Sequence, residues 1–328
     1  MLTAADFQPP RWLRNPHLQT VLGTSGMRGW MGEQQLAAIG AVTTTHLLDG
    51  GNGVRLQGFH SAIPGVEPAG LALLLHGWEG SADSGYMRLT AAALLGKGIE
   101  VFRLNFRDHG GTHHLNSGLF HSNRIDEVLH AATDLARRFP ARPLTVGGYS
   151  LGGNFALRLA LRAPAAGLPL GHVAVICPLL DPARTMDAME VGFPPYMRHF
   201  ESKWRRSLER KRRLFPQQYD FDDGVLGLRM RPLTRWMVER NTDFDSLESY
   251  FEGYSLAGDR LGQLRVPTSI LMAADDPVIP VDDLVHSRMA PGVELEISPW
   301  GGHCGFLRNG RLDGFGEQWL AQRLASAS

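Results

Sequence analysis

A single serine, Ser150, has the local sequence of a chemical nucleophile. It lies in residues 148–152, which read GYSLG and match the pattern G-x-S-x-G. Residues 144–147 predict a short buried strand before it, and residues 153–160 predict a helix after it. A serine on so sharp a strand-to-helix turn holds its hydroxyl out over the sheet, and the glycines allow the tight packing that such a turn needs. An ordinary glycine-rich turn is the alternative, but the strand and the helix around it favour a nucleophilic Ser150.

The general base that this serine needs is predicted to be His303. In hydrolases that use this turn, an acid and then a histidine follow the serine along the chain. His286 lies in residues 281–288, which look like an exposed helix. His303 lies in the glycine-rich residues 300–305, directly after a strand-like stretch at 293–297. Because a glycine-rich loop after a strand can turn an imidazole inward, His303 is the preferred base.

Two adjacent carboxylates, Asp275 and Asp276, are candidates for the acid that orients the imidazole. Residues 268–273 before them are apolar and β-branched, which predicts a strand. A carboxylate at the end of this strand can reach the imidazole and fix its tautomer. The alternation of side chains along a strand does not decide which aspartate reaches the imidazole. One of the two could instead cap a helix that begins near Pro280. The D-x-x-x-P spacing from Asp276 to Pro280 is typical of this turn, so Asp276 is the preferred acid.

Two backbone N–H groups are predicted to stabilise the oxyanion that forms when an acyl carbonyl is attacked. Residues 70–75 are continuously apolar, as expected for a strand that is covered on both faces. They lead into residues 76–80, HGWEG, a loop of the pattern H-G-x-x-G. We expect the N–H of Trp78 in this loop and the N–H of Leu151 after the serine to point at the oxyanion. Loss of one such donor typically raises the barrier by about 3 kcal/mol.

The elements that must position these residues alternate between strand and helix. Residues 41–48 and 54–60 predict an antiparallel strand pair around a turn signal. This alternation predicts an α/β fold with a mostly parallel, doubly wound sheet, whose ligands bind beyond the carboxyl ends of the strands. The turns that carry the candidate catalytic residues all lie at the carboxyl ends of predicted strands. The further predicted strands are 71–75, 100–104, 144–147, 173–177, 268–273 and 293–297, and the predicted helices include 84–97 and 124–138.

The alternation breaks between residues 181 and 258, where the sequence looks helical. A segment of this length is too long for a simple loop, so we predict a helical cap or lid at 181–258. The core then comprises residues 1–180 and 259–328, with 1–40 as an N-terminal extension. The methionine and aromatic side chains of the cap either pack within it or line an apolar, adaptable pocket beside Ser150. They are Met186, Met189, Phe193, Tyr196, Met197, Phe200, Trp204, Phe215, Tyr219, Phe221, Met230, Trp236 and Met237.

Composition narrows the class of protein. Basic and acidic residues balance at 33 each, so no general attraction to nucleic acid is expected. Two cysteines, Cys177 and Cys304, are too few for a disulfide framework and favour a reducing compartment. Without the pattern of a secretory signal or the roughly 20 apolar residues of a membrane span, a soluble, cytoplasmic protein is expected. The basic residues of 203–213 are typical of a solvated helix face, and weak peripheral contact with anionic lipid is the second interpretation.

The other histidines carry weaker signals. His121 and Asp126 match H-x-x-x-x-D, a pattern associated with acyl transfer in some enzymes. Asn123 and Asp126 are, however, more typical of a helix N-cap and its capping box. His17 and the histidine pair at 113–114 lack the carboxylates and cysteines that accompany metal sites. We therefore expect no metal ion and no cofactor.

Six short motifs, spread over nearly the whole chain, resemble one family. They are RNPHLQT at 14–20, HGWEG at 76–80, NFRDHGG at 105–111, GYSLG at 148–152, AADDP at 273–277 and GGHCGF at 301–306. Together they resemble the YheT-like branch of the α/β-hydrolases, the group that includes the mammalian abhydrolase-domain proteins 1 to 3. The resemblance runs from about residue 11 to the last helix, and NPHLQT is the most specific of the motifs because it is rare outside this branch.

The resemblance implies an α/β-hydrolase fold with an eight-stranded sheet and a helical cap insertion. It also implies a serine esterase or lipase with Ser150, Asp276 and His303 as its triad. The sequence departs from the family at two positions. Asp108 and Asn123 stand where relatives usually have glycine, which bears on the substrate entrance rather than on the triad.

The resulting hypothesis is a metal-independent serine hydrolase that cleaves carboxylic esters. Ser150 would form an acyl-enzyme, His303 would move the proton, and Asp276 would stabilise the imidazolium. The expected partner is a small hydrophobic ester with a short- to medium-chain acyl group, and acylglycerols are one candidate class. The alternative is an acyltransferase, in which an alcohol replaces water in the second step. A non-catalytic binding module is the third interpretation.

Overall fold

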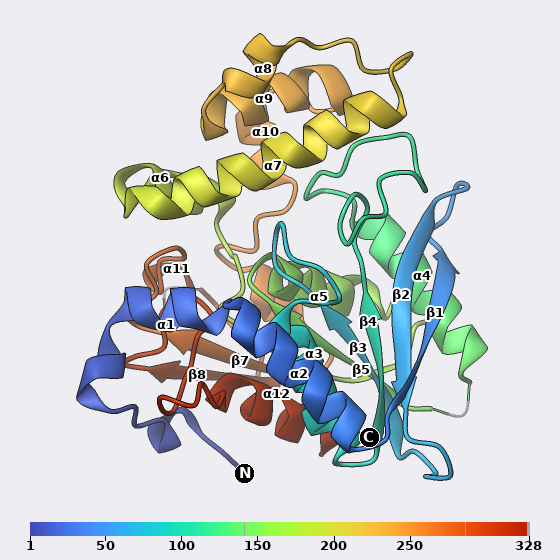
Figure 1. The fold of residues 1–328 in the computed structure, drawn as a ribbon, viewed down its shortest axis with the longest axis vertical. Coiled ribbons are helices and arrows are strands. Elements are labelled where there is room, and N and C mark those ends of the chain that lie inside the picture. Colours follow the sequence, from blue (N-terminus) through green and yellow to red (C-terminus); the bar gives the residue numbers. More distant parts are fainter. Residues whose placement is uncertain (141, 286, 327–328) are drawn as a thin grey trace.

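A computed structural model describes residues 1–140, 142–285 and 287–326, and an eight-stranded sheet forms the centre of this structure (Figure 1). The strand order is β1-β2-β4-β3-β5-β6-β7-β8. β2 pairs antiparallel with β1 and with β4, and the other neighbouring strands are parallel. The predicted α/β fold with a mostly parallel sheet is therefore confirmed. The strands are β1 (Val42–Asp49), β2 (Arg55–Ala62), β3 (Gly70–Leu75), β4 (Ile99–Leu104), β5 (Leu144–Tyr149), β6 (Leu170–Ile176), β7 (Thr268–Ala273) and β8 (Val293–Ser298).

The strands in the middle of the sheet are more deeply buried than the strand at its edge. β3 and β5 are buried along their whole length, and the continuously apolar sequence of β3 predicts this for a strand covered on both faces. β1 is rich in threonine and mostly exposed, because it forms one edge of the sheet. The apolar interior thus surrounds the strands that lead into the candidate site.

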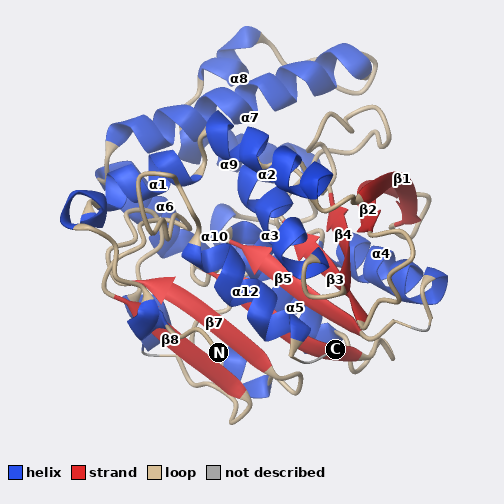
Figure 2. Cartoon of the chain, turned by 60° about the horizontal axis from the view of Figure 1, so that its bottom comes forward, coloured by secondary structure: helices blue, strands red, loops and turns tan. Residues whose placement is uncertain are grey.

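Helices cover both faces of the sheet (Figure 2). α3 (Gly85–Leu95) and α12 (Phe315–Ala325) pack together on one face, and α2 (Gly26–Ala38) packs on α3. α5 (Leu151–Arg162) packs with α4 (Ile125–Arg138) on the other face. This arrangement buries the strands β3, β5 and β7 and leaves the region beyond the carboxyl ends of the parallel strands for a site.

A helical insertion between β6 and β7 occupies that region (Figure 1). Its longest helix, α7, begins at Pro194, where the fixed φ of proline suits a first turn. It ends at Leu214 with three basic residues in its last turn, which complement the helix dipole. The helices of the insertion are α6 (Pro182–Val191), α7 (Pro194–Leu214), α8 (Asp223–Gly227), α9 (Met230–Asn241) and α10 (Leu247–Glu252). The exact boundaries of the cap, 181–258, stay a prediction.

The N-terminal segment folds back onto the core. Its helix α1 (Pro16–Gly23) begins after Asn15, whose side chain accepts the N–H groups of His17 and Leu18. Asparagine at the N-cap and proline in the first turn are favoured at helix starts, which explains the beginning of the NPHLQT motif. The remaining short elements are the 3-10 helices η1 (Ala4–Asp6), η2 (Arg11–Arg14) and η3 (Arg260–Gln263), and the helix α11 (Asp282–Val285).

Local capping at Asn123 was predicted wrongly. The N-cap of α4 is Arg124, and the Asn123 amide instead donates to the carbonyl oxygen of Tyr250 at 2.8 Å. A tertiary contact with the insertion therefore replaces the local bond.

His286, the rejected candidate for the base, lies outside the described residues. In the part of the chain that the structure describes, no helix combines the length and the apolar character that crossing a membrane requires.

Candidate active site

Ser150 lies on a tight turn between β5 and α5. Its φ of 53° and ψ of −120° fall in a region that residues other than glycine rarely adopt. Both glycines of the motif are required by close approach of the backbone. A Cβ atom on Gly148 would lie 2.4 Å from the carbonyl oxygen of Gly152, and one on Gly152 would lie 2.3 Å from that of Leu75. The pattern G-x-S-x-G therefore follows from the shape of this turn.

The structure brings the three predicted residues Ser150, His303 and Asp276 together. His303 Nε2 lies 2.9 Å from Ser150 Oγ, and His303 Nδ1 lies 2.9 Å from Asp276 Oδ2. The Asp276 carboxylate is fully buried, and its Oδ1 accepts the N–H groups of Val278 and Ile279. When Nδ1 donates to the carboxylate, Nε2 is the acceptor that faces the serine hydroxyl. The geometry thus allows a proton to pass from Ser150 to the imidazole.

The neighbouring Asp275 has a different partner. Its Oδ1 accepts the N–H of Gly302 at 2.9 Å, next to His303. Its Oδ2 is buried and has no hydrogen-bond partner among the described residues, and burial raises the pKa of Asp275. Of the two carboxylates, Asp276 contacts the imidazole, whereas Asp275 holds the loop that carries it.

The charge of Asp276 governs the titration of His303. Burial disfavours the imidazolium, but the charge of Asp276, the neighbouring Cys304 and the hydrogen bond to Asp276 together outweigh burial and raise the pKa of His303 to about 9. A general base accepts a proton only in its neutral form, which predominates above this pKa.

We therefore expect kcat/KM on a p-nitrophenyl ester to rise with pH and to level off above about pH 9. Initial rates between about pH 6 and about pH 10, corrected for uncatalysed hydrolysis, measure this limb. In Asp276→Asn the residual activity should titrate at lower pH, because the carboxylate that raises the pKa is gone. A wild-type limb centred on the ordinary value of 6.5 would contradict this role of the Asp276 charge.

The loop at 76–80 runs beside the candidate nucleophile. A Cβ atom on Gly77 would lie 3.3 Å from the Cβ of Ser150. Within the described residues, neither the N–H of Trp78 nor the N–H of Leu151 has a hydrogen-bond acceptor. Both groups are thus available to an oxygen atom of a bound molecule, as an oxyanion hole requires.

Side chains that were not identified from the sequence hold this loop in place. The N–H of Gly77 donates to Tyr86 Oη at 3.0 Å, and the N–H of Glu79 donates to His109 Nε2 at 3.2 Å. Burial lowers the pKa of His109 to about 4, so the ring is neutral near pH 7 and Nε2 can accept. Its Nδ1 donates to the carbonyl oxygen of Arg107 at 2.7 Å. The sequence did contain a sign of this role of His109, because the residue belongs to the NFRDHGG motif. No function had been assigned to that histidine.

The N-terminal helix α1 supports the His303 loop from another side. Thr20 Oγ1 accepts the backbone N–H of His303 at 2.9 Å. The Gln19 side chain binds the backbone of Leu307 twice, donating to its carbonyl oxygen and accepting its N–H. The NPHLQT motif therefore encodes a contact that fixes the loop of the candidate base. Sequence reasoning recognised the motif without finding this role.

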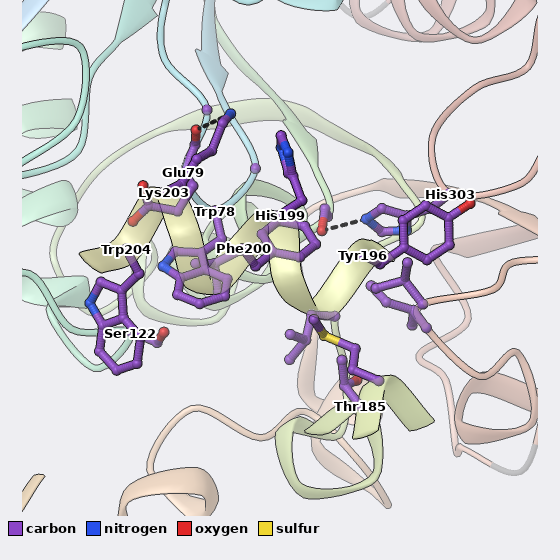
Figure 3. A pocket seen from close by; sticks show the side chains of 18 of the residues that line it. Trp78, Glu79, Ser122, Thr185, Tyr196, His199, Phe200, Lys203, Trp204 and His303 are labelled. Carbon is purple, nitrogen blue, oxygen red and sulfur yellow. Dashed lines mark hydrogen bonds between the residues drawn. The ribbon is translucent and has the colours of Figure 1, made fainter. Parts of the chain in front are cut away.

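An apolar pocket of about 510 Å³ lies above Ser150 and His303. Figure 3 shows the aromatic side of the pocket, where Trp78 stacks on Phe200 with ring centroids 5.3 Å apart. Both interpretations of the insertion's apolar residues hold, because some line the pocket and others, such as Phe221, pack inside the insertion. The predicted residues that line the pocket are Met186, Met189, Phe193, Tyr196, Phe200, Trp204, Met230 and Met237.

Asp108 and Lys211 form a buried ion pair that joins the core to α7. Lys211 Nζ is fully buried and donates to Asp108 Oδ1 at 2.6 Å and to the carbonyl oxygens of His113 and Asn116. The second oxygen of Asp108 accepts the N–H of Phe120. Asp108 has a φ of 61°, a conformation that glycine adopts readily and other residues rarely adopt. In this chain the aspartate supplies a counter-ion for Lys211.

The prediction that the basic residues of 203–213 form a solvated helix face is therefore only partly correct. Besides Lys211, Lys203 is half-buried, and its Nζ donates to the carbonyl oxygen of Glu79 at the pocket (Figure 3). Burial raises the pKa of Glu79 to about 7. A contact of this segment with anionic lipid would depend on its exposed residues. The exposed basic residues are Arg206, Arg210 and Arg213.

The pattern H-x-x-x-x-D does not form a His–Asp pair. His121 lines the pocket, and its Nδ1 is buried with no hydrogen-bond partner in the described structure. Asp126 forms an ion pair with Arg162 instead. Among the described residues, neither His17 nor the histidines at 113–114 belong to a group of three side chains that could hold a metal ion.

Known proteins resemble this chain in both sequence and fold. The "putative esterase" YheT of Escherichia coli K12 is 27% identical over 98% of this chain and 92% of its own length. A protein of Synechocystis sp. with the same description is 28% identical over 81% of this chain and 78% of its own. An esterase of Pyrococcus furiosus shares the fold, with a TM-score of 0.58 and 15% identity over 89% of this chain and 91% of that one. The resemblance to the YheT-like branch is thereby confirmed.

A sequence model of the alpha/beta hydrolase family matches residues 72–312. This match includes the turn of Ser150, both candidate carboxylates and the loop of His303. It covers well over half of the sequence, and the chain therefore belongs to the alpha/beta hydrolase family.

Proposed function

We propose that the chain is a serine esterase that hydrolyses hydrophobic carboxylic esters through an acyl-enzyme on Ser150. The observation that carries the proposal is the hydrogen-bonded series Ser150–His303–Asp276 at the base of an apolar pocket. At the level of the family the chain is a carboxylesterase-like hydrolase, and the names of its relatives support an ester as the substrate.

The proposed reaction uses the residues in fixed roles. Ser150 Oγ attacks the ester carbonyl carbon while His303 Nε2 takes the hydroxyl proton, and Asp276 stabilises the imidazolium. The N–H groups of Trp78 and Leu151 donate to the oxyanion. His303 then gives its proton to the departing alcohol, which leaves the acyl group on Ser150. Water, deprotonated by His303, attacks this acyl group, and His303 returns the proton to Ser150 Oγ as the acid leaves.

The pocket supports a hydrophobic acyl group. Its volume of about 510 Å³ lies within the range of small-molecule sites, and its wall is dominated by aromatic and methionine side chains. Methionine is flexible and polarisable, so Met186, Met189 and Met237 can adapt to chains of different length. These features support short- to medium-chain acyl esters, the substrates expected from the sequence.

A series of p-nitrophenyl esters tests the proposal. Full burial of a methylene contributes about 0.8 kcal/mol, so four methylenes could raise kcat/KM by roughly 200-fold, and partial burial should still give about tenfold from the acetyl to the hexanoyl ester. Initial rates for acetyl, butanoyl, hexanoyl and octanoyl esters measure this rise. Ser150→Ala is the control and should be inactive on all of them. Acetyl esters cleaved faster than hexanoyl esters would contradict the acyl pocket.

The same assays separate the proposal from its alternatives. With added ethanol, an acyltransferase would release more ethyl ester than free acid, whereas the proposed hydrolase releases mainly the acid. A fluorophosphonate probe should label the wild-type protein and leave Ser150→Ala unlabelled. Absence of labelling in the wild type would support a non-catalytic binding module instead.

A further inference from the structure

The two cysteines of the chain lie next to the candidate base. Cys177 follows β6, is fully buried and has a φ of 44°, and Cys304 directly follows His303 and has a φ of 59°. Such positive φ values are uncommon for residues other than glycine. The thiol of Cys177 points to the carbonyl oxygen of Gly302, and that of Cys304 points to the carbonyl oxygen of Ile176. Each thiol therefore reaches into the segment that carries the other.

These thiols and the imidazole of His303 form a compact set of soft donors. One ligand atom from each of Cys177, His303 and Cys304 lies within 4.8 Å of the others, the only such group of three among the described residues. In a tetrahedral zinc site, bond lengths of about 2.3 Å to sulfur and about 2.0 Å to nitrogen place the donors roughly 3.5 to 3.8 Å apart. Shifts of about 1 Å or less would close the three donors around one ion.

We propose that Cys177, Cys304 and His303 form an inhibitory binding site for a thiophilic divalent cation such as Zn²⁺ or Cd²⁺. On binding, each thiol releases its proton to solvent and binds as a thiolate, and the neutral imidazole contributes a nitrogen lone pair. Sulfur donors favour soft and borderline ions over Mg²⁺ and Ca²⁺, so hard cations should not occupy the site. Cys304 and His303 both line the pocket, which gives the ion a route from solvent.

Binding at this site would stop the proposed reaction, a consequence that rests on the proposed function. Both ring nitrogens of His303 are already engaged, Nε2 by Ser150 and Nδ1 by Asp276. An ion on Nε2 removes the acceptor for the serine proton, and an ion on Nδ1 removes the carboxylate from the ring. Either choice leaves the imidazole unable to act as a base.

Cadmium binding tests the site without any activity assay. Cd²⁺ is titrated into the reduced protein and into Ser150→Ala, and the ultraviolet absorption of cadmium–thiolate bonds is recorded. One ion per chain is expected in both proteins. Cys177→Ala, Cys304→Ala and His303→Ala should each weaken binding by at least about tenfold. Even the loss of a residue that only hydrogen-bonds to a metal ligand lowers metal affinity by about 10- to 100-fold. The exposed His114 provides the matched control, and His114→Ala should bind as the wild type does.

Two results of this titration would overturn the proposal. One is equal binding by the wild type and by the two cysteine variants. The other is weakened binding in His114→Ala, which would place the ion elsewhere on the surface. Thermal melting of each variant shows that it is folded, and Cys177→Ser provides a second replacement of similar volume if Cys177→Ala melts early.

Inhibition by Zn²⁺ is then measured on a p-nitrophenyl ester, each variant being compared with its own rate without metal. In Cys177→Ala the half-inhibiting concentration should rise by at least about tenfold, and Mg²⁺ should not inhibit either protein. A chelator should restore the wild-type rate. Activity that returns only with a thiol reductant would mean oxidation of the cysteines and would overturn the proposal. Because the cadmium titration does not depend on turnover, a lack of esterase activity would refute the proposed function while leaving the site testable.

Discussion

Asp276→Asn should lower kcat on an ester substrate by about 10⁴-fold, the loss expected when the histidine is held in the wrong tautomer. The backbone N–H groups of Val278 and Ile279 fix how the new amide is oriented. They keep an oxygen in the place of Asp276 Oδ1, so the amide nitrogen must face His303 Nδ1. An N–H donor there forces the ring proton onto Nε2. His303 can then no longer accept the proton of Ser150.

Asp275→Asn is the matched control for this prediction. The Oδ1 of Asp275 accepts the N–H of Gly302, and an asparagine oxygen can keep that bond. Its other oxygen has no partner among the described residues, so an amide nitrogen there breaks no hydrogen bond. We expect Asp275→Asn to keep most of the wild-type kcat. If Asp275→Asn instead proved the more damaging of the two, Asp276 would lose its assigned role.

Asp108→Gly should destabilise the protein by about 3–5 kcal/mol, because it leaves the ammonium group of Lys211 buried without a counter-ion. The carbonyl oxygens of His113 and Asn116 remain as partners, but they carry no full charge. Glycine is the suitable replacement because the φ of 61° at position 108 suits it without strain. Urea unfolding followed by circular dichroism measures the loss.

A double variant separates the charge from other effects of this substitution. In Asp108→Gly with Lys211→Met, neither charge remains, so most of the lost stability should return. Glu209→Gln is the control on the same helix, since it breaks an exposed ion pair with Arg213 and should cost less than about 1 kcal/mol. Equal stability of Asp108→Gly and Glu209→Gln would show that the buried pair is not a significant support of α7.

Sequence reasoning performed well where local sterics determine the residue. The turn of Ser150 demands glycine at positions 148 and 152, and this demand is visible as a motif. The burial of β3 likewise follows from its continuous apolar run. The choice between Asp275 and Asp276 was harder, because adjacent side chains at the end of a strand share the same neighbourhood. Only the three-dimensional course of the chain shows which one meets the imidazole.

Long-range pairings were the part that the sequence could not provide. Lys211 belongs to a basic segment that is typical of a solvated face, and nothing near it indicates Asp108, which lies 103 residues away. At Asn123 a capping pattern was present, but the tertiary contact with Tyr250 replaced the local bond. The NPHLQT motif could be recognised, yet its contact with His303 depends on how the two ends of the fold come together.

The separation of 283 residues between Thr20 and His303 also has a consequence in time. A ribosome adds about 5–20 residues per second, so α1 is made roughly 15–60 s before the loop that it supports. In the later part of that interval, while the 153 residues from Ser150 to His303 are added, the growing chain carries Ser150 without its proposed proton acceptor. Under the proposed function the nascent protein is therefore inactive toward esters, and activity begins only when the loop of His303 docks onto the earlier-made helix α1.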